Sequence, residues 1–185
     1  MFDVNQITNF LSPDDCDHII SKFGKNLFEI GTVGGETQQY RIADGNWIYD
    51  YNDPIVLDIA NRIATLTGFP LENQENPHVV KYEVGGKYLP HHDYFLEDKY
   101  VDTTLNRGGQ RTYTCIIYLN DDFTGGGTDF PNIKFTNAPV KGSLCYWKNI
   151  NSSGGLNEDS LHAGLPVESG RKWILIIWIR ENKFT

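Results

Sequence analysis

The apolar residues in the first part of the chain recur with the spacing of helices. The stretch LSPDDCDHIISKFG (11–24) carries Ser12 as a helix cap, Pro13 in the first turn and Gly24 at its end, which together predict a helix. A second helix is predicted over 53–68, where a Gly-Phe-Pro turn follows. The apolar residues of this second segment lie at roughly helical spacing: Ile55, Leu57, Ile59, Ile63 and Leu66.

The pattern changes after residue 76, where short apolar or alternating runs are separated by glycine-rich turns. In HVVKYEV (78–84), Val80, Tyr82 and Val84 fall on one face of a predicted strand. Further predicted strands lie at 111–121, 142–147 and 171–180, with glycine-rich breaks at 106–110, 123–132 and 151–157. Short strands after a helical N-terminal part predict an α+β, mainly β fold, a sandwich or jelly roll with flanking helices.

One polar stretch between two predicted strands stands out by its length. Residues 97–109 read EDKYVDTTLNRGG. Long polar loops in compact domains are often lids, so this segment is a candidate lid. The chain shows no linker, internal repeat or low-complexity tract, and residues 1–185 are expected to form one domain.

Composition narrows the class of partner and the compartment. The formal net charge is -8, which disfavours binding to nucleic acid. The cysteines at 16, 115 and 145 lack CxxC spacing, so buried thiols in a reducing compartment are expected. Neither a secretory signal nor an apolar run of about 18 residues is visible. These features predict a cytoplasmic protein without membrane association, and they leave its oligomeric state open.

The sequence YLPHHDYF (88–95) brings two histidines and an aspartate together. Because side chains alternate along an extended chain, His91 and Asp93 are expected to face one side and His92 the other. His162, which precedes the last predicted strand, can supply a third ligand. Two imidazoles and one carboxylate leave positions open on a metal, an arrangement that suits the Fe(II) of non-haem oxygenases.

An iron site of this kind needs two further electrons to activate O2, and an oxo-acid such as 2-oxoglutarate can supply them. Its distal carboxylate would need a buried cation. Lys172 lies on the same predicted strand face as Trp178, and a lysine there is costly unless it meets an anion. The hydroxyl groups of Tyr82 and Thr128 could add hydrogen bonds to the co-substrate.

Each of these features also has a simpler explanation. An HxD triplet is common, Lys172 could lie at an exposed strand end, and Arg111 could be half of a surface ion pair. The glycine triplet 125–127 could be a flexible turn. The order in which the features follow one another along the chain favours the site.

Five segments in this order resemble the Fe(II)- and 2-oxoglutarate-dependent prolyl 4-hydroxylases. They are NFLSPDDCDHII, RIATLTGFPLENQENPHVVKYEVGGKYLPHHDYF, GGQRTYTCIIYLNDDFTGGGTDFP, VKGSLCYW and LHAGLPVESGRKWILIIWIR. The likeness runs from about residue 7 to residue 180 and is to the small bacterial, viral or algal members. It implies a double-stranded β-helix (jelly roll) with N-terminal helices packed on one sheet.

The resemblance also implies roles for single residues. The metal ligands of the family fall on His91, Asp93 and His162, which makes His92 a spacer. The positions that bind 2-oxoglutarate fall on Lys172, Tyr82 and Thr128. The positions that contact the peptide fall on Tyr88, Arg111 and Trp178. The chain departs from the family pattern in the three glycines before Thr128 and in the glycine- and serine-rich loop before His162, which bear on peptide preference more than on the chemistry.

The implied function is 4-hydroxylation of prolyl residues in a peptide or protein. Fe(II), 2-oxoglutarate, O2 and ascorbate would take part, and succinate and CO2 would be formed. Fold and ligands do not separate this substrate from another amino acid, a small metabolite or a nucleobase, so these stay as alternatives. A non-catalytic peptide-binding module is a further alternative, and the intact ligand set with Lys172 argues against it.

Overall fold

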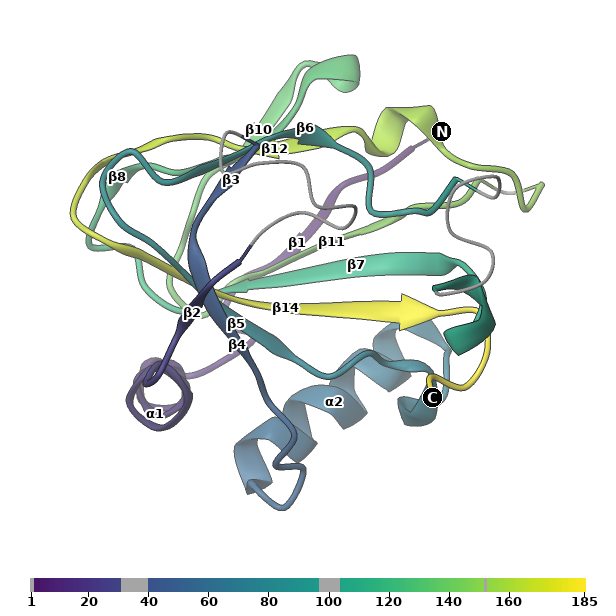
Figure 1. The fold of residues 1–185 in the computed structure, drawn as a ribbon, viewed down its shortest axis with the longest axis horizontal. Helices are drawn as coiled ribbons and strands as arrows, with labels where there is room; N and C mark the ends of the chain where they lie inside the picture. The colour runs from purple at the N-terminus through teal and green to yellow at the C-terminus, as the bar shows by residue number, and fades with distance from the viewer. Residues whose placement is uncertain (1, 31–39, 97–103, 152) are drawn as a thin grey trace.

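Two antiparallel sheets face each other in the computed structural model, which describes residues 2–30, 40–96, 104–151 and 153–185 (Figure 1). The seven-stranded sheet has the order β1 (Asn5–Ile7), β11 (Leu144–Lys148), β7 (Arg111–Tyr118), β14 (Lys172–Arg180), β5 (His78–Tyr82), β4 (Asp44–Trp47) and β2 (Phe28–Glu29). The five-stranded sheet has the order β10 (Phe135–Asn137), β9 (Thr128–Phe130), β12 (His162–Gly164), β6 (Lys87–His91) and β3 (Arg41–Ile42). A two-stranded sheet joins β13 (Val167–Ser169) to β8 (Thr124–Gly125). This is the predicted jelly roll, and the fold is mainly β.

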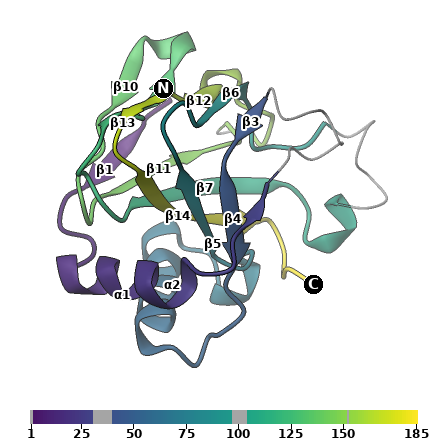
Figure 2. The same cartoon turned by 60° about the vertical axis from the view of Figure 1, so that its left-hand side comes forward.

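The two predicted helices are confirmed, and both pack on the outer face of the larger sheet. They are α1 (Pro13–Phe23) and α2 (Pro54–Thr67), which lie side by side in Figure 2. Helix residues Ile19, Ile59 and Ile63 are fully buried against the sheet in one apolar cluster. Leu57, which the spacing placed on the same face, is instead 41% exposed.

The aspartate that caps α2 also ties the two helices together. Oδ1 of Asp53 accepts hydrogen bonds from the backbone N–H groups of Ile55 and Val56, at 3.0 and 3.1 Å. Oδ2 contacts Nζ of Lys22 at 2.7 Å and Nε2 of His18 at 2.8 Å, both from α1. The carboxylate therefore satisfies the start of one helix and fixes the position of the other.

A second apolar cluster fills the space between the two sheets. Along β14, Ile174, Ile176 and Trp178 point inward, while β5 contributes Val80 and Tyr82. Because helices cover one face of these strands and the smaller sheet covers the other, β7 and β14 are apolar on both faces. The prediction that Val84 continues the inner face of β5 was wrong, since the strand ends at Tyr82 and Val84 is 63% exposed.

An irregularity at the start of β7 changes the direction of one predicted site residue. Ile179 pairs with Tyr113, but the next residue, Arg180, pairs with Arg111, so the register shifts by one. Tyr113 packs on the helix side of the sheet, whereas the guanidinium of Arg111 lies over the ring of Trp178 on the inner side. Regular alternation along the strand would place Arg111 on the face of Tyr113, and the bulge redirects its side chain to the other face.

The structure describes only part of the predicted lid at 97–109. Residues 97–103 of the predicted lid lie outside the described residues, and the remainder contains a short 3-10 helix, η2 (Leu105–Arg107). Among the residues that the structure describes, no helix combines the length and the apolar character that crossing a membrane requires.

The shared role of Asp53 gives a stability prediction. Asp53→Ala should lower the free energy of unfolding by about 2 kcal/mol, against about 1 kcal/mol for Ser12→Ala, whose side chain caps α1 at an exposed position. Burial opposes ionisation of Asp53, but hydrogen bonds from Lys22 and His18 outweigh it and lower the pKa of the carboxyl group. The stabilisation should therefore be complete above pH ~4 and lost on acidification. Urea unfolding of both variants at pH 7 and in acid measures it, and equal costs would contradict the account.

Candidate active site

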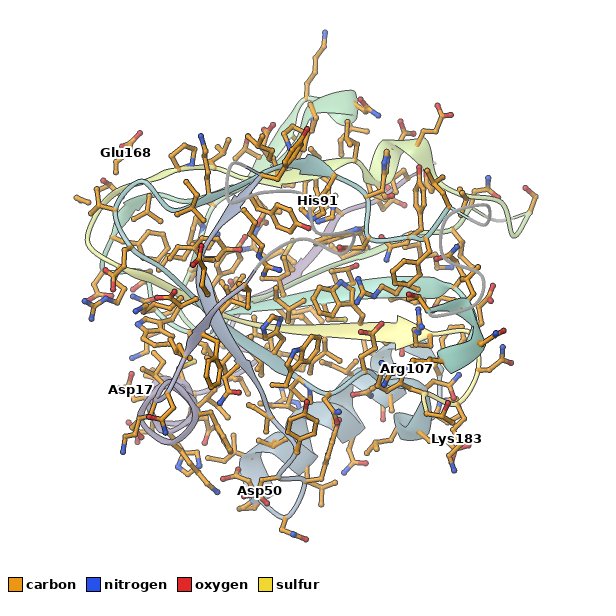
Figure 3. The ribbon with its side chains drawn as sticks, in the orientation of Figure 1. Asp17, Asp50, His91, Arg107, Glu168 and Lys183 are labelled. Atoms are coloured by element: carbon orange, nitrogen blue, oxygen red, sulfur yellow. The ribbon has the colours of Figure 1, made fainter. Side chains whose placement is uncertain are left out.

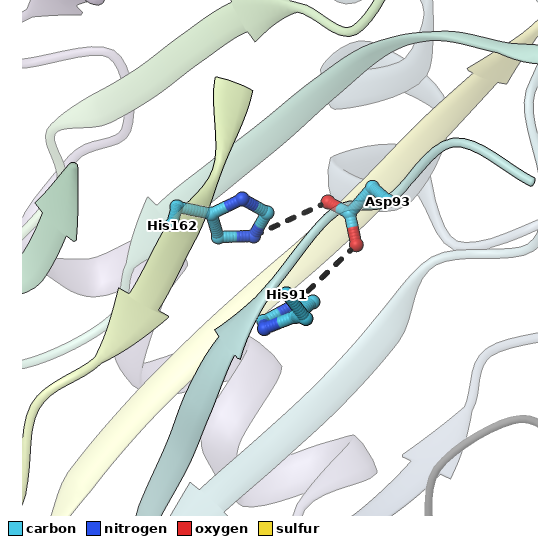
Figure 4. A group of neighbouring side chains, drawn as sticks. All are labelled: His91, Asp93 and His162. Carbon is cyan, nitrogen blue, oxygen red and sulfur yellow. Dashed lines mark ion pairs between the residues drawn. The ribbon is translucent and has the colours of Figure 1, made fainter. Parts of the chain in front are cut away.

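Three predicted metal ligands meet on the inner side of the smaller sheet. His91 ends β6 and His162 begins β12, and the two residues pair directly across these antiparallel strands. Asp93 follows His91 by two residues. Nε2 of His91 lies 3.7 Å from Oδ1 of Asp93, and Nε2 of His162 lies 3.5 Å from Oδ2 (Figure 4). One ligand atom from each residue lies within 4.8 Å of the other two, close enough to share a metal ion.

Backbone carbonyl groups set the orientation of both imidazoles. Nδ1 of His91 lies 2.8 Å from the oxygen of Leu89, and Nδ1 of His162 lies 2.9 Å from the oxygen of Ser160. A carbonyl oxygen only accepts, so each Nδ1 carries the hydrogen and each Nε2 presents its lone pair to Asp93 and the space between the three residues. This is how proteins prepare histidines for metal binding.

The protonation states suit a metal site as well. Burial lowers the pKa of His91 to about 3, and it also lowers the pKa of His162, so both imidazoles are neutral at pH 7. Burial alone would raise the pKa of Asp93, but the facing His162 and His91, the positive charge of Arg111 and the hydrogen bond from Thr114 together lower it, so the carboxylate is ionised. Neutral imidazoles and an ionised carboxylate are the forms that bind a cation.

A buried hydrogen-bond chain holds Asp93 from behind. The hydroxyl of Thr114 donates to Oδ2 of Asp93 at 2.7 Å. Nδ2 of Asn149 donates to Thr114 at 2.8 Å, and the indole of Trp147 donates to Asn149 at 3.0 Å. The sequence analysis missed these three residues. Alternation along β7 places Thr114 on the inner face, but nothing in the sequence links it to Asn149.

The remaining histidines lie outside this group. His92 faces away from the ligands, as expected, with Nε2 3.2 Å from the oxygen of Glu158 and its ring stacked on Tyr94. His18 binds the cap of α2, and His78 is buried and stacked on Trp47. The structure therefore brings together the three residues of the HxD…H pattern and no other histidine.

The three candidate ligands lie in a pocket between the two sheets that also contains a buried lysine. Lys172, at the start of β14, is 2% exposed, and its Nζ donates to the oxygen of Gly126 at 2.6 Å. Among the described residues, no carboxylate forms an ion pair with it. Burial lowers its pKa to about 7. A cation so placed favours an anionic ligand.

Hydroxyl groups surround this end of the pocket. Tyr82 and Thr128 line it with Lys172, as the sequence analysis predicted. The hydroxyl of Thr128 lies 2.6 Å from that of Tyr118, which in turn accepts from Asn137 at 3.3 Å. Tyr118 and Asn137 were not predicted. Their hydrogen bonds hold the hydroxyl group of Thr128 in one orientation.

The glycine triplet has a steric reason. Gly126 has a φ of +65°, and a Cβ there would lie 2.8 Å from the ring of Phe123 and 3.2 Å from Cδ of Lys172. A side chain would therefore displace Phe123 or the lysine itself. The turn allows the backbone oxygen of residue 126 to approach the ammonium group.

The three predicted substrate residues occupy different positions. Tyr88 lines the pocket and stacks on His91 with ring centroids 3.5 Å apart, and Trp178 lines the same pocket. Arg111 lies behind Trp178, outside the pocket lining, and binds Glu75 through two hydrogen bonds of 2.6 and 2.8 Å. Its Nε and Nη2 are therefore already used within the protein.

The pocket contains a second cation, Arg41, which the sequence analysis did not predict. Arg41 is 7% exposed, lines the pocket and lies over the ring of Tyr88. It comes from β3, a strand of two residues, which is too short to show the alternation that identifies a strand in a sequence.

Comparison with known proteins agrees with this geometry. Residues 77–180 match the family model of the 2OG-Fe(II) oxygenase superfamily. A protein of Acanthamoeba polyphaga mimivirus that bears the name of a prolyl 4-hydroxylase is 35% identical over 181 residues, which cover 97% of this chain and 74% of the relative. Prolyl 4-hydroxylase 5 of Arabidopsis thaliana is 31% identical over 201 residues, which cover 95% of this chain and 67% of the relative.

Solved structures extend the likeness to the fold. The crystal structure of a viral collagen prolyl hydroxylase from Paramecium Bursaria Chlorella virus-1, a 2OG complex, superposes with a TM-score of 0.78 at 28% identity. The superposition covers 96% of this chain and 95% of that one. The matched segment contains the three candidate metal ligands and Lys172. The chain therefore belongs to the 2OG-Fe(II) oxygenase superfamily, and the relatives named above bear the names of prolyl hydroxylases.

Proposed function

We propose that this chain is a prolyl 4-hydroxylase that oxidises a proline residue of a peptide or protein and converts 2-oxoglutarate and O2 into succinate and CO2. The observation that carries the proposal is the shared pocket. One cavity contains two neutral imidazoles, an ionised carboxylate and, at its other end, a buried lysine without a carboxylate partner among the described residues. Names of relatives at 31–35% identity over nearly the whole chain support the substrate class.

In this proposal His91, Asp93 and His162 hold Fe(II). The fit rests on the donor set, because two nitrogen donors and one oxygen donor on one side leave the other coordination positions open. Thr114 engages Oδ2 of Asp93, so Oδ1 is the oxygen without a hydrogen bond among the described residues. Iron with bound 2-oxoglutarate supplies the oxidation of an unactivated C–H bond, which no side chain can perform.

Lys172 holds the distal carboxylate of 2-oxoglutarate, with hydrogen bonds from Tyr82 and Thr128. An ammonium group in a buried site binds a carboxylate far more strongly than it would in water. Tyr118 keeps the hydroxyl of Thr128 in place. These residues orient the co-substrate and, because the pocket is buried between two sheets, exclude bulk water from it.

The peptide is proposed to cross the pocket at Tyr88 and Trp178. Aromatic rings pack well on the pyrrolidine rings of an extended, polyproline-like segment. Arg111 fixes Trp178 from behind by stacking on it, at 4.0 Å between the guanidinium carbon and the ring centre. The further role predicted for Arg111, donation to peptide carbonyl groups, stays a prediction, because Glu75 already occupies two of its nitrogens.

Two further expectations belong to the same proposal. Ascorbate is expected to support turnover as a reductant. A cytoplasmic location is supported by the cysteines, since Cys16, Cys115 and Cys145 are buried and unpaired.

The direct test of the activity is incubation with Fe(II), 2-oxoglutarate, ascorbate and a panel of proline-rich peptides. Gain of one oxygen atom on proline, localised by fragmentation, is expected. Turnover only with a free amino acid or a nucleobase would overturn the prolyl assignment.

The ligand assignment predicts a clear difference between neighbouring histidines. His91→Ala and His162→Ala should abolish succinate formation and weaken Fe(II) binding by about a hundredfold or more, whereas His92→Ala should bind Fe(II) like the wild type. Calorimetric titration with Fe(II) under argon measures the affinity, and thermal unfolding checks the fold. Loss of iron from His92→Ala but not from His91→Ala would show that the faces are exchanged.

Lys172 gives a prediction about pH. Binding a carboxylate raises the pKa of the ammonium group, so affinity for 2-oxoglutarate is complete below the pKa of the free lysine, about 7, and falls as the pH rises above it. The decline should approach tenfold per pH unit. Lys172→Met should bind 2-oxoglutarate about a hundredfold more weakly at pH 6.5, without this dependence. The measurement is equilibrium binding to the iron-loaded protein between pH 6 and 9, and an unchanged affinity in the variant would contradict the assignment.

The position of Trp178 in the pocket predicts that its loss affects only the turnover that a peptide stimulates. Trp178→Ala should reduce peptide-stimulated succinate formation about tenfold or more, because a large packing surface is lost. Slow decay of 2-oxoglutarate without peptide should persist, since the iron ligands and Lys172 are retained. Succinate measured with and without a proline-rich peptide separates the two. Equal loss of both activities would place Trp178 in the co-substrate site instead.

A further inference from the structure

A second cavity lies next to the metal pocket, where β7 begins and β14 ends. Its volume is about 320 Å³, and it lies around Glu75, Phe95, Arg107, Arg111, Arg180 and Phe184. Arg107 marks this region in Figure 3. Trp178 separates the two cavities, since its ring lines the metal pocket and Arg111 stacks on it. We call this second cavity the arginine pocket.

The charges of the arginine pocket do not balance. Glu75 forms two hydrogen bonds with Arg111, and Nε of Arg107 donates to the backbone oxygen of Thr185 at 2.8 Å. Arg180 is 1% exposed and donates one Nη2 hydrogen bond to the backbone oxygen of Thr104. Its Nε and Nη1 have no hydrogen-bond partner among the described residues.

Arg180 is therefore a buried cation with donors to spare. Its nearest carboxylate oxygen belongs to Glu75, 3.5 Å from Nε, and Arg111 already uses that oxygen. Burial, together with the positive charges of Arg111 and Arg107, lowers the pKa of Arg180 to about 10, although Glu75 opposes this effect. A buried guanidinium with unpaired donors is costly, and an anion that accepts a hydrogen bond from Nη1 would reduce this cost.

The shape of the site favours a carboxylate on a peptide side chain. The lining contains three arginines and one glutamate, so it has an excess of positive charge, and the open Nη1 of Arg180 can donate to a carboxylate oxygen. The walls are aromatic, with Phe95 stacked near both Arg111 and Arg180, and such walls suit the methylene groups of a side chain. The protein as a whole carries a charge of -8, so this local positive charge runs against the general trend of the chain.

The distance between the two pockets is short enough for one peptide to reach both. Arg180 follows Trp178 by two residues on β14, which corresponds to about 7 Å along a strand. A polyproline-like peptide advances about 3.1 Å per residue. A peptide whose proline lies against Trp178 would thus bring the residue two or three positions away to the arginine pocket.

We propose that the arginine pocket binds the side-chain carboxylate of an Asp or Glu two or three residues from the target proline. Arg180 is its main contact, and the enzyme thereby selects acidic proline-containing sequences. This inference rests on the proposed prolyl hydroxylase function, because it assumes that a peptide crosses the metal pocket.

The test compares matched proline-rich peptides that carry Glu or Gln at each of the three positions before and after the proline. Binding to the iron- and 2-oxoglutarate-loaded protein is measured under argon, and kcat/KM is measured in air. For the wild type, the Glu peptide should bind about tenfold or more tightly than the Gln peptide at one position, two or three residues from the proline. Arg180→Gln should bring this ratio close to one, and Arg180→Lys should retain part of it.

Arg171→Gln is the matched control, since it removes the same charge from an exposed residue that pairs with Glu83. It should keep the preference of the wild type, which excludes a general charge effect. A preference that survives in Arg180→Gln, or a wild type that binds Glu and Gln peptides alike at every position, would overturn the inference. Binding without hydroxylation of any peptide would instead count against the prolyl function, and the Glu-to-Gln ratio would still decide the role of Arg180.

Discussion

The pairing of β6 with β12 is the constraint on which the site depends. It sets His91 directly opposite His162 and leaves Asp93 just beyond the strand end, where its carboxylate can turn toward both imidazoles. Because side chains alternate between the two faces of a strand, a shift of one residue in this pairing would move the inward side chains of one strand to the outer face. The carbonyl groups of Leu89 and Ser160, which orient the two rings, belong to the same backbone. Ligand positions and ring orientations therefore follow from one sheet register.

A second constraint is the cost of buried charge. Three cations, Lys172, Arg41 and Arg180, are nearly buried. Arg41 and Arg180 have nitrogen donors without a hydrogen-bond partner among the described residues, and Lys172 has no carboxylate partner among them. Arg111 is buried too, but Glu75 satisfies it. Proteins rarely bury unpaired charges without function, since each one lowers stability. The inner surface of this jelly roll is thus prepared for anionic and carbonyl-rich ligands, while the surface of the chain carries an excess of negative charge.

Local signals in the sequence predicted much of this arrangement. The cap at Ser12 and the stops at Gly24 and Gly68 predicted the helices, and the HxD spacing with a distant histidine indicated the candidate ligands. Other features depend on contacts between distant segments, which no local pattern encodes. The chain from Trp147 through Asn149 to Thr114 and the pair of Glu75 with Arg111 are of this kind. The bulge beside Arg111 was not predicted either, because a register shift depends on how two strands pair and not on the sequence of one of them.

The central claim is that one pocket binds iron at His91, Asp93 and His162 and 2-oxoglutarate at Lys172. Its most direct test is a crystal structure of the protein grown under argon with Fe(II) and 2-oxoglutarate, with anomalous scattering used to locate the metal. The account predicts a single iron bound by Nε2 of both histidines and Oδ1 of Asp93, with the distal carboxylate of 2-oxoglutarate in contact with Nζ of Lys172. Iron bound elsewhere, or 2-oxoglutarate bound away from Lys172, would contradict it.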